Sequence, residues 1–401
     1  MYSPIRRVLI VAGISAAALL TGCGVVVGEG NGTVGVALVG SPACGFAEVN
    51  VTVTAVRVHQ DASADVKASG WKEIVLEPAS RVNLARLTNG EMVSLDQTSL
   101  PAGVYNQVRL VLDPSAGTSI ANSVTLPSAP ANQIRLDTPA SVQDGIKVAS
   151  SPFEVTAGER TDLVLNIDAC RSVVTNGVGG YALRPVAKVV PTTLNGITGF
   201  VDPLILPSNV VISAQQNGVV VGSTVPTAGG EFTVPRLPPG NYDVVFTADN
   251  RVTSVVAAVP VEADERTVIS STGTPVTLPL AATSARSIGG TAVLDPASTT
   301  DEVAYVSARQ SFAAGPNVTV MLRGVDASDS SYTLSNLPSA APRLAQYRAG
   351  QPLEFVTQSN TIPGTGRYAV VASATGYAAG TITSVDIRTG NQASVDFTLE
   401  P

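Results

Sequence analysis

The sequence predicts an all-β fold of three serial β-sandwich domains, and three observations support this. Val, Thr, Ser, Ala, Gly and Pro dominate the 401 residues, and such residues favour strands and turns over helices. Beyond the first segment, no long stretch spaces its apolar residues as a helix would. Short apolar segments instead alternate with clusters of turn residues along the chain, which is typical of sandwiches.

The N-terminal segment has the features of an export signal. Arg6 and Arg7 precede an uncharged stretch of thirteen residues, 8–20. A membrane span needs about 20 residues, so this length fits the apolar part of a secretory signal instead. The stretch ends in Leu20-Thr21-Gly22-Cys23. This sequence resembles the bacterial lipobox, in which a branched apolar residue and two small residues precede a cysteine.

The lipobox resemblance implies a cleaved lipoprotein signal peptide, residues 1–22, with cleavage between Gly22 and Cys23. Cys23 would then become the lipidated first residue of the mature chain, acylated with chains such as palmitate. Several acyl chains together anchor a protein stably to a membrane. The alternatives are an ordinary signal peptide with a chance cysteine and a retained membrane anchor.

The residues after Cys23 predict a destination. In lipoproteins of Gram-negative bacteria, an aspartate at the next position typically retains the protein at the inner membrane, whereas this chain has Gly24. We therefore expect the outer membrane, with the domains projecting into the periplasm or beyond. Residues 23–32 are rich in glycine, which predicts a flexible lipidated tether.

Length and charge narrow the class of protein. Removing residues 1–22 leaves 379 residues, enough for two to four domains. Charged residues make up 14% of the chain and the net charge is −7. No basic patch offers a footprint for nucleic acid, so we expect no nucleic-acid partner.

The remaining cysteines, Cys44 and Cys170, form an even pair in an oxidising compartment, which predicts a disulfide. Closing so long a loop stabilises a fold by about 4–5 kcal/mol in the chain-entropy view. Cys170 lies on the opposite strand face from Leu163, Leu165 and Ile167, so a turn would have to redirect it. The alternative is two separate buried thiols.

The first expected domain covers residues 33–193. Val49, Val51 and Val53 alternate as one face of a strand, and a change of phase near Ala55 predicts a β-bulge or a strand buried on both faces. The Asn89-Gly90 pair predicts the turn of a hairpin between two short strands.

Four segments of this domain carry a family resemblance: VNVTVTAVRVHQ, LPAGVYNQVRLVL, LVLNIDACRSVV and YALRPVAKVVP. In this order they resemble a domain of unknown function of the DUF4382 type, which is common in exported bacterial and archaeal lipoproteins. The resemblance implies an exported β-rich domain. It brings no catalytic residue, because the family has none assigned.

The second expected domain covers residues 194–283. Gly229-Gly230 precedes Phe232, and Leu237 to Gly240 precedes a strand in which Tyr242, Val244 and Phe246 share a face. This order resembles the carboxypeptidase regulatory-like, or prealbumin-like, β-sandwich. That fold serves as a spacer or a binding module in many proteins, so the resemblance says little about function.

The third expected domain, residues 284–401, resembles a diverged copy of the second within the same immunoglobulin-like class of sandwich. Gly366-Arg367-Tyr368 repeats Gly240-Asn241-Tyr242. A long proline-containing insertion, residues 338–364, interrupts the copy, and its structure is not predicted.

Few residues suggest catalysis. His59 is the single histidine and lies at a strand end, where a solvated side chain is a commoner outcome than a base or a ligand. No second histidine completes a zinc site, and the chain has neither a G-x-S-x-G elbow nor a phosphate-binding loop. Trp71 is expected in the core, and with few other aromatic residues this weakens a sugar-binding interpretation.

Six aspartates are candidate calcium ligands, namely Asp113, Asp137, Asp162, Asp168, Asp326 and Asp329, but solvated acids at strand ends are the better interpretation. The sequence thus predicts a lipid-anchored cell-envelope protein of structural or interaction type. We expect no catalysis, cofactor or metal, and an envelope protein or a cell-wall component as partner. The alternatives are a carbohydrate- or calcium-binding module outside the cytoplasm and, with less support, a hydrolase with an unrecognised acid site.

Overall fold

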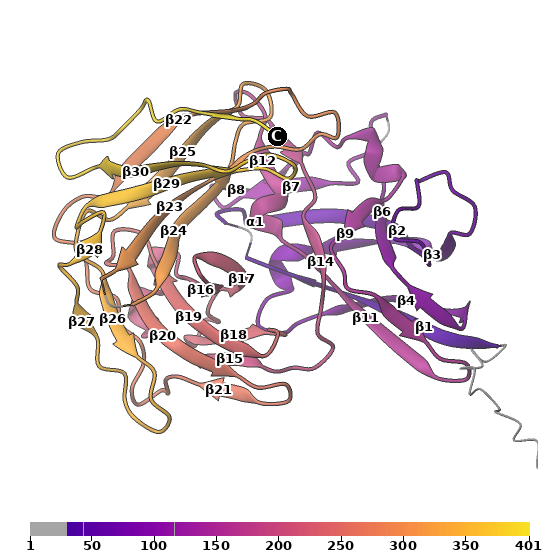
Figure 1. Cartoon of the computed structure of the whole chain (residues 1–401), viewed down its shortest axis with the longest axis horizontal. Coiled ribbons are helices and arrows are strands. Elements are labelled where there is room, and N and C mark those ends of the chain that lie inside the picture. The colour runs from indigo at the N-terminus through magenta and orange to yellow at the C-terminus, as the bar shows by residue number, and fades with distance from the viewer. Residues whose placement is uncertain (1–29, 43, 116, 314) are drawn as a thin grey trace, which may run out of the picture.

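Strands make up almost all of the regular structure in the computed structural model, which describes residues 30–42, 44–115, 117–313 and 315–401 (Figure 1). Within these ranges the helices are short: α1 (Ala169–Ser172) and the 3₁₀ turns η1 (Leu84–Arg86), η2 (Ala140–Gln143) and η3 (Pro203–Ser208). The predicted all-β class is confirmed. The strands form three modules, which are numbered 1 to 3 in chain order and are defined below by their sheets.

Module 1 packs two sheets face to face. One sheet has the order β14-β11-β1-β4, in which β1 and β11 run parallel, and the other has the order β8-β7-β2-β6-β9, with β3 also paired to β2. Two small ribbons, β10-β5 and β12-β13, lie beside them. The strands are β1 (Asn31–Gly40), β2 (Glu48–His59), β3 (Lys72–Asn83), β4 (Val93–Pro101), β5 (Gly103–Tyr105), β6 (Gln107–Leu112), β7 (Ser123–Leu126), β8 (Ala129–Arg135), β9 (Ile146–Val148), β10 (Phe153–Val155), β11 (Arg160–Ile167), β12 (Val173–Thr175), β13 (Tyr181–Leu183) and β14 (Ala187–Val190).

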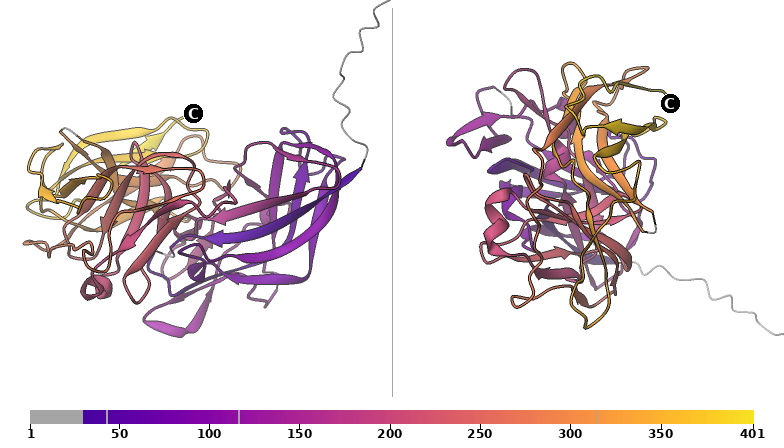
Figure 2. Two further views of the ribbon diagram at one scale, coloured as in Figure 1. Left: turned by 90° about the horizontal axis from the view of Figure 1, so that it is seen from below. Right: turned by 90° about the vertical axis from the view of Figure 1, so that its left-hand side faces the viewer.

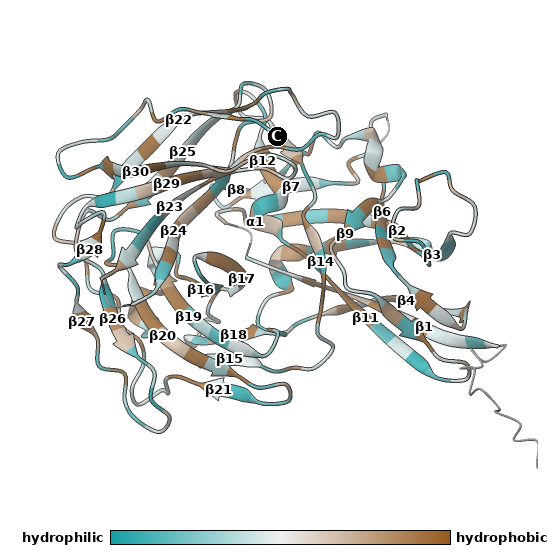
Figure 3. Ribbon diagram, in the orientation of Figure 1, coloured by the Kyte–Doolittle hydropathy of each residue, from teal (hydrophilic) through white to brown (hydrophobic). Residues whose placement is uncertain are grey.

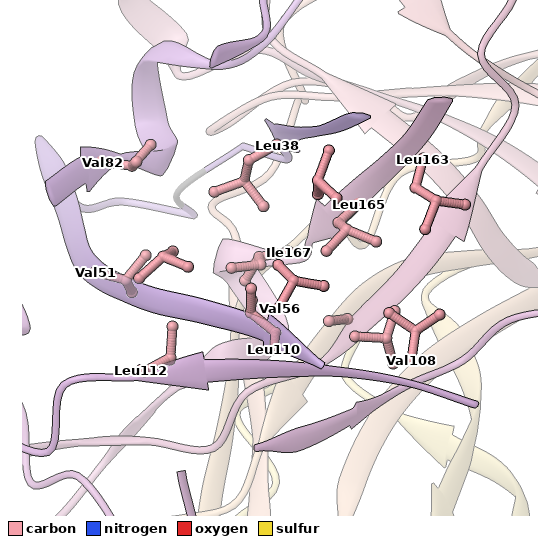
Figure 4. Close-up of a cluster of buried hydrophobic side chains, with 14 of the residues drawn as sticks. Leu38, Val51, Val56, Val82, Val108, Leu110, Leu112, Leu163, Leu165 and Ile167 are labelled. Carbon is pink, nitrogen blue, oxygen red and sulfur yellow. The ribbon is translucent and has the colours of Figure 1, made fainter. Parts of the chain in front are cut away.

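The core of module 1 follows from alternation along these strands. Leu163 and Leu165 of β11 face Leu110 and Leu112 of β6, and all four are buried (Figure 4). The predicted bulge near Ala55 is present, because the register of β2 with both β3 and β6 shifts between Val53 and Ala55. The shift lets residues on both sides of the bulge reach the core.

The predicted hairpin at Asn89-Gly90 is wrong, although the turn itself forms. Asn89 and Gly90 both have positive φ, as a tight primed turn requires, and the amide of Glu91 donates to the carbonyl of Thr88. The flanking strands do not pair, because β3 lies in one sheet and β4 in the other. The 3₁₀ turn η1 after β3 carries the chain across the sandwich before the turn begins.

Module 2 has a small sheet, β18-β15-β21, opposite a larger one, β17-β16-β19-β20-β26-β27. As predicted, Tyr242, Val244 and Phe246 point into its core together with Phe232. The strands are β15 (Gly196–Phe200), β16 (Val211–Gln216), β17 (Val219–Thr224), β18 (Glu231–Pro235), β19 (Gly240–Thr247), β20 (Ser254–Val261), β21 (Arg266–Val268), β26 (Arg343–Gln346) and β27 (Val356–Thr357).

Module 3 repeats the plan with the sheets β25-β22-β31 and β24-β23-β29-β30, and β28 pairs with β23. Burial alternates strictly along β29, where Tyr368, Val370 and Ala372 are buried. Figure 3 shows such alternation as short brown and teal stretches along many strands. The strands are β22 (Arg286–Leu294), β23 (Tyr305–Phe312), β24 (Asn317–Gly324), β25 (Ser331–Leu337), β28 (Thr361–Ile362), β29 (Arg367–Ser373), β30 (Gly380–Asp386) and β31 (Phe397–Leu399).

The insertion at residues 338–364 joins modules 2 and 3. Its strand β26 runs parallel to β20 and extends the larger sheet of module 2, and β27 closes that sheet beyond it (Figure 1). Ala345 of β26 belongs to the core of module 2. A segment that leaves module 3 and returns to it thus supplies two strands to its neighbour.

Modules 2 and 3 also share a hydrophobic core. Val244 and Val256 face into module 2, whereas Val245, Val255 and Ala257 of the same two strands pack with the buried residues of module 3. The middle strands β19 and β20 of the larger sheet of module 2 are therefore buried on both faces. Figure 2 shows modules 2 and 3 as one body, with module 1 against its side.

Candidate functional site

The predicted lipidation site, Cys23, and the cleavage position after Gly22 lie outside the described residues, which begin at Gly30. Strand β1 starts at Asn31, so it includes the last two residues of the expected tether. Within the described ranges, no helix has the length and apolar character of a membrane span.

The predicted disulfide between Cys44 and Cys170 is present, with Cα atoms 5.0 Å apart and a sequence separation of 126. Cys44 lies in the turn after β1, and Cys170 lies in α1. Asp168 caps this helix by accepting a hydrogen bond from the amide of Arg171 at 3.1 Å. The capped turn redirects the chain after β11, which explains how Cys170 reaches Cys44 despite its position on the strand.

The ring of His59 holds a surface loop. Its Nδ1 accepts from the amide of Asp61 at 2.9 Å, and its Nε2 lies 3.0 Å from the carbonyl oxygen of Ser69. The indole of Trp71 donates to the carbonyl of Asp65 at 2.9 Å in the same loop. Both ring nitrogens of His59 are thus engaged by backbone groups.

The expectation that Trp71 is a core residue is wrong. Trp71 precedes β3 rather than lying within it, and its side chain is half-buried. The ring stands 5.0 Å from the ring of His59, and the guanidinium groups of Arg57 and Arg109 lie 5.0 and 5.5 Å from its centre. Cationic contacts of this kind suit an indole at a module's edge.

The six aspartates do not come together. Most accept hydrogen bonds locally: Asp113 from the amide of Ser115, Asp162 from Arg160, and Asp329 from the amide of Ser331. Asp162 lies within β11 rather than at its end. In the described part of the chain, no three His, Cys, Asp or Glu side chains are grouped as a metal site would require.

Asp326 has a different role, because it ties module 3 to module 1. Its carboxylate accepts from the amide of Gly177 at 3.1 Å and from the amide of Ser328 at 2.8 Å. Burial acts to raise the pKa of Asp326, but the hydrogen bonds from Ser328 and Gly177 outweigh it and lower the pKa to about 2. Beside it, the amide of Ala327 donates to the carbonyl of Thr175 at 2.8 Å.

A second contact between modules 1 and 3 surrounds Arg171. The hydroxyl of Tyr305 donates to the carbonyl of Arg171 at 3.0 Å, and the Arg171 guanidinium lies 4.6 Å from the centre of the Tyr305 ring. Burial raises the pKa of Tyr305 well above its usual range, so its hydroxyl stays a donor.

Asn89, the residue of the misassigned hairpin, joins module 1 to module 2. Its side-chain nitrogen donates to the carbonyl of Val225 at 2.9 Å, and its side-chain oxygen accepts from the amide of Thr233 at 2.9 Å. The hydroxyl of Thr224 also donates to this oxygen at 2.9 Å. The turn therefore projects from module 1 and contacts module 2.

Gln215 joins module 2 to module 3 in a similar way. Its amide makes two hydrogen bonds with the backbone of Thr319, one in each direction and each 2.8 Å long. The hydroxyl of Thr319 donates to the carbonyl of Gly218 at 2.6 Å. Gln215 is 1% exposed, so this pair is a buried polar lock.

All three modules line one cavity of about 670 Å³. Module 1 contributes the disulfide and the residues around it, such as Phe46. Module 2 contributes residues of β16, β17 and the end of β19, and module 3 contributes residues of β24. The sequence does not predict this cavity, because its walls come from segments far apart in the chain.

Charged side chains are also present in this cavity: Asp168, Arg171, Asp249, Arg251 and Arg323. Burial raises the pKa of Asp168, and burial lowers the pKa of Arg323, partly opposed by Asp249. None of these five takes part in any of the five ion pairs found among the described residues.

These features define the class of the protein as a multi-module β-sandwich chain with its modules locked together. Within the chain, residues 31–185, which cover most of module 1, match the family described as Domain of unknown function (DUF4382). This match confirms the family resemblance of that domain. No curated protein matches the chain.

Several solved structures are similar at low identity. The Bacillus anthracis TIE protein is 12% identical, with 93% of this chain and 51% of that chain covered and a TM-score of 0.16. The chain therefore spans about half the length of that protein. A streptococcal ancillary pilin is 11% identical, with coverages of 92% and 98% and a TM-score of 0.15. The Corynebacterium diphtheriae major pilin SpaA is 10% identical, with coverages of 92% and 100% and a TM-score of 0.20.

Proposed function

We propose that this chain is a lipid-anchored cell-envelope protein of structural or interaction type. The lipid is attached at Cys23, and the protein resides in the outer membrane of a Gram-negative bacterium. The basic pair, the apolar stretch and the lipobox before Cys23 support the anchor. Modules 2 and 3 act as carboxypeptidase regulatory-like sandwiches that extend module 1.

The observation that carries this proposal is the locking of the modules. Strand β26 crosses from module 3 into the sheet of module 2, and Val245 and Val255 connect the two cores. Independent domains on linkers would not need such contacts, because interfaces between mobile domains are smaller and more polar. A rigid body on a membrane anchor can present one continuous surface to an envelope protein or to the cell wall.

The disulfide supports a location of the protein in an oxidising compartment. Structural disulfides persist in oxidising compartments such as the periplasm and the cell surface, and they are rare in the cytosol. Cys44 and Cys170 are joined to each other, so the thiol of Cys23 is the one cysteine left for lipid.

Metabolic labelling with a palmitate analogue tests the proposal. We expect the wild-type protein to incorporate the label and to sediment with membranes, and Cys23→Ala to lose both properties. The control is the double variant Cys44→Ala/Cys170→Ala, which lacks the other two thiols and should still be labelled. An unlabelled wild-type protein, or a labelled Cys23→Ala variant, would overturn the anchor.

A further inference from the structure

The cavity between the three modules has the size and place of a ligand site. Its volume of about 670 Å³ falls within the range of about 300–1,000 Å³ typical of pockets for small molecules. Such pockets occur preferentially at interfaces between domains. The hydrogen bonds of Asn89, Gln215 and Asp326 between modules hold the three walls in place.

Much of the wall is apolar. Residues from all three modules contribute to it, among them Phe46, Val211, Val220, Val225 and Met321. An apolar wall of this kind gains free energy when the apolar part of a ligand displaces water from it.

The two carboxylates in the wall already have hydrogen-bond donors. Asp249 accepts from the side-chain amides of Asn209 at 2.6 Å and Asn336 at 2.7 Å, one for each oxygen. Asp168 accepts from the amide of Arg171 as the cap of α1. Both carboxylates therefore already have hydrogen-bond partners within the protein.

The guanidinium groups in the wall differ in how many of their nitrogens have hydrogen-bond partners. Arg251 uses two of its three nitrogens, because its Nε donates to the hydroxyl of Ser208 at 3.0 Å and one Nη donates to the carbonyl of Leu278 at 2.7 Å. Arg323 uses a single nitrogen, Nη1, which donates to the carbonyl of Leu322 at 3.0 Å and lies 3.6 Å from the sulfur of Cys170. Among the described residues, the other nitrogens of Arg323 have no hydrogen-bond partner, and no carboxylate lies within ion-pair distance of it.

Arg171 lies at the same corner of the cavity, next to Cys170 in the chain. Its Nε is buried and has no hydrogen-bond partner in the part of the chain that the structure describes. A guanidinium group removed from water costs free energy unless an anion or several acceptors compensate it. The corner around Cys170 thus has cationic donors in excess over acceptors.

We propose that the cavity binds a small amphipathic acid, with an apolar body against the valine-rich wall and an acidic group paired with Arg323. The planar guanidinium fork suits a carboxylate, sulfonate or phosphate group, each of which offers two oxygens at matching positions. This site goes beyond the proposed function, because every residue that forms it lies in the modules and none in the lipid anchor.

Two fluorescent probes with nearly the same ring system test this assignment. Anilinonaphthalene sulfonate carries an acidic group, and phenylnaphthylamine does not. The protein is the full chain with Cys23→Ser, which prevents lipid from competing for an apolar probe. Both probes are titrated against this protein and against further variants in the same background.

Arg323→Gln should weaken binding of the sulfonate by about tenfold, since a charge-assisted hydrogen bond is lost, and leave binding of the neutral probe unchanged. Arg323→Lys should retain most of the affinity for the sulfonate. The matched control is Arg309→Gln, a half-buried arginine of module 3 outside the cavity wall, which should behave as the parent. Val220→Trp, which places an indole in the cavity, should weaken saturable binding of both probes.

The proposal is overturned if Arg323→Gln leaves the affinity for the sulfonate unchanged, or if Arg309→Gln lowers it equally. An affinity for both probes that Val220→Trp leaves unchanged would also overturn it, because the probes would then be bound elsewhere. Thermal unfolding of each variant shows that it is folded before the probes are added.

Discussion

The hydroxyl of Tyr368 donates a hydrogen bond to the carbonyl of Pro338 at 2.6 Å, although thirty residues separate them. The other modules contain the same bond across a short turn. Tyr242 donates to Pro238 at 2.7 Å and Tyr105 donates to Pro101 at 3.0 Å, each over four residues. The insertion in module 3 has therefore entered a turn whose closing bond is kept.

The sequence around these tyrosines has one form in all three modules. Modules 1 and 2 have Leu-Pro-x-Gly-x-Tyr, at 100–105 and 237–242. Module 3 has Leu337-Pro338 and, beyond the insertion, Gly366-Arg367-Tyr368. This motif is the sequence signal that locates both ends of the insertion.

Tyr368→Phe tests the closing bond. Tyr368 is fully buried, so the substitution leaves the carbonyl of Pro338 without its donor and should lower the free energy of unfolding by about 1–3 kcal/mol. The control is Tyr377→Phe, which removes a more exposed bond to the carbonyl of Pro296 and should cost less. Urea unfolding measures both, and equal losses would contradict the role of the buried bond.

Ala345→Asp tests whether the insertion belongs to module 2. Ala345 is 2% exposed in the core of that module, so a carboxylate there would be buried without a partner and should destabilise module 2 strongly. Gln346→Asp places the same charge on the next residue, which is exposed, and should change stability little. Hydrogen exchange at β19 and β20 is the measurement. Unchanged protection there in Ala345→Asp would show that β26 does not support the sheet.

Cys44→Ala/Cys170→Ala tests the disulfide as a stabilising link within module 1. Opening a loop of 126 residues should cost about 5 kcal/mol in the chain-entropy view. The wild-type protein treated with a reductant should show the same loss, and the double variant should not respond to the reductant. A wild-type stability that is indifferent to reduction would contradict the link.

Asp326→Asn tests the pH dependence of the contact between modules 1 and 3. The pKa of Asp326 is about 2 in the folded protein against an ordinary value of 3.8, so its ionised form is favoured by folding. This contribution is fully present above about pH 4 and is lost as the pH falls through about 2. The stability difference between wild type and variant should therefore shrink on acidification.

The control for this experiment is Asp329→Asn, an exposed neighbour whose carboxylate accepts from the amide of Ser331 within the same turn. Urea midpoints are compared at about pH 6 and about pH 2 for both variants. If the gap between wild type and Asp326→Asn stays constant with pH, the carboxylate of Asp326 is not the group that binds the modules.

The sequence predicted the structural features that depend mainly on residues close together in the chain. The inward positions of Tyr242, Val244 and Phe246 and the bulge at Ala55 follow from the two-residue period of a strand. The Asn89-Gly90 turn was also predicted, because few residue pairs accept two positive φ angles. The strands that it would join were not, since the turn type does not determine which sheet each flanking strand enters.

Contacts between distant segments were beyond sequence reasoning. Nothing near Ala345 indicates that its strand pairs with β20, and nothing near Arg323 indicates Cys170 as its neighbour. The prediction that Trp71 lies in the core was wrong for a related reason. The size of its side chain favours the core, but its position before β3 leaves it beside Arg57.

The most direct test of the locked modules is calorimetry with one core substitution in each of modules 2 and 3. Phe232→Leu and Leu334→Ala alter residues that are fully buried in the cores of modules 2 and 3. If the shared core and β26 make the two modules one cooperative unit, both substitutions lower the same thermal transition by several degrees. Two separate transitions, each moved by only one of the substitutions, would show that the modules unfold independently and would contradict the account.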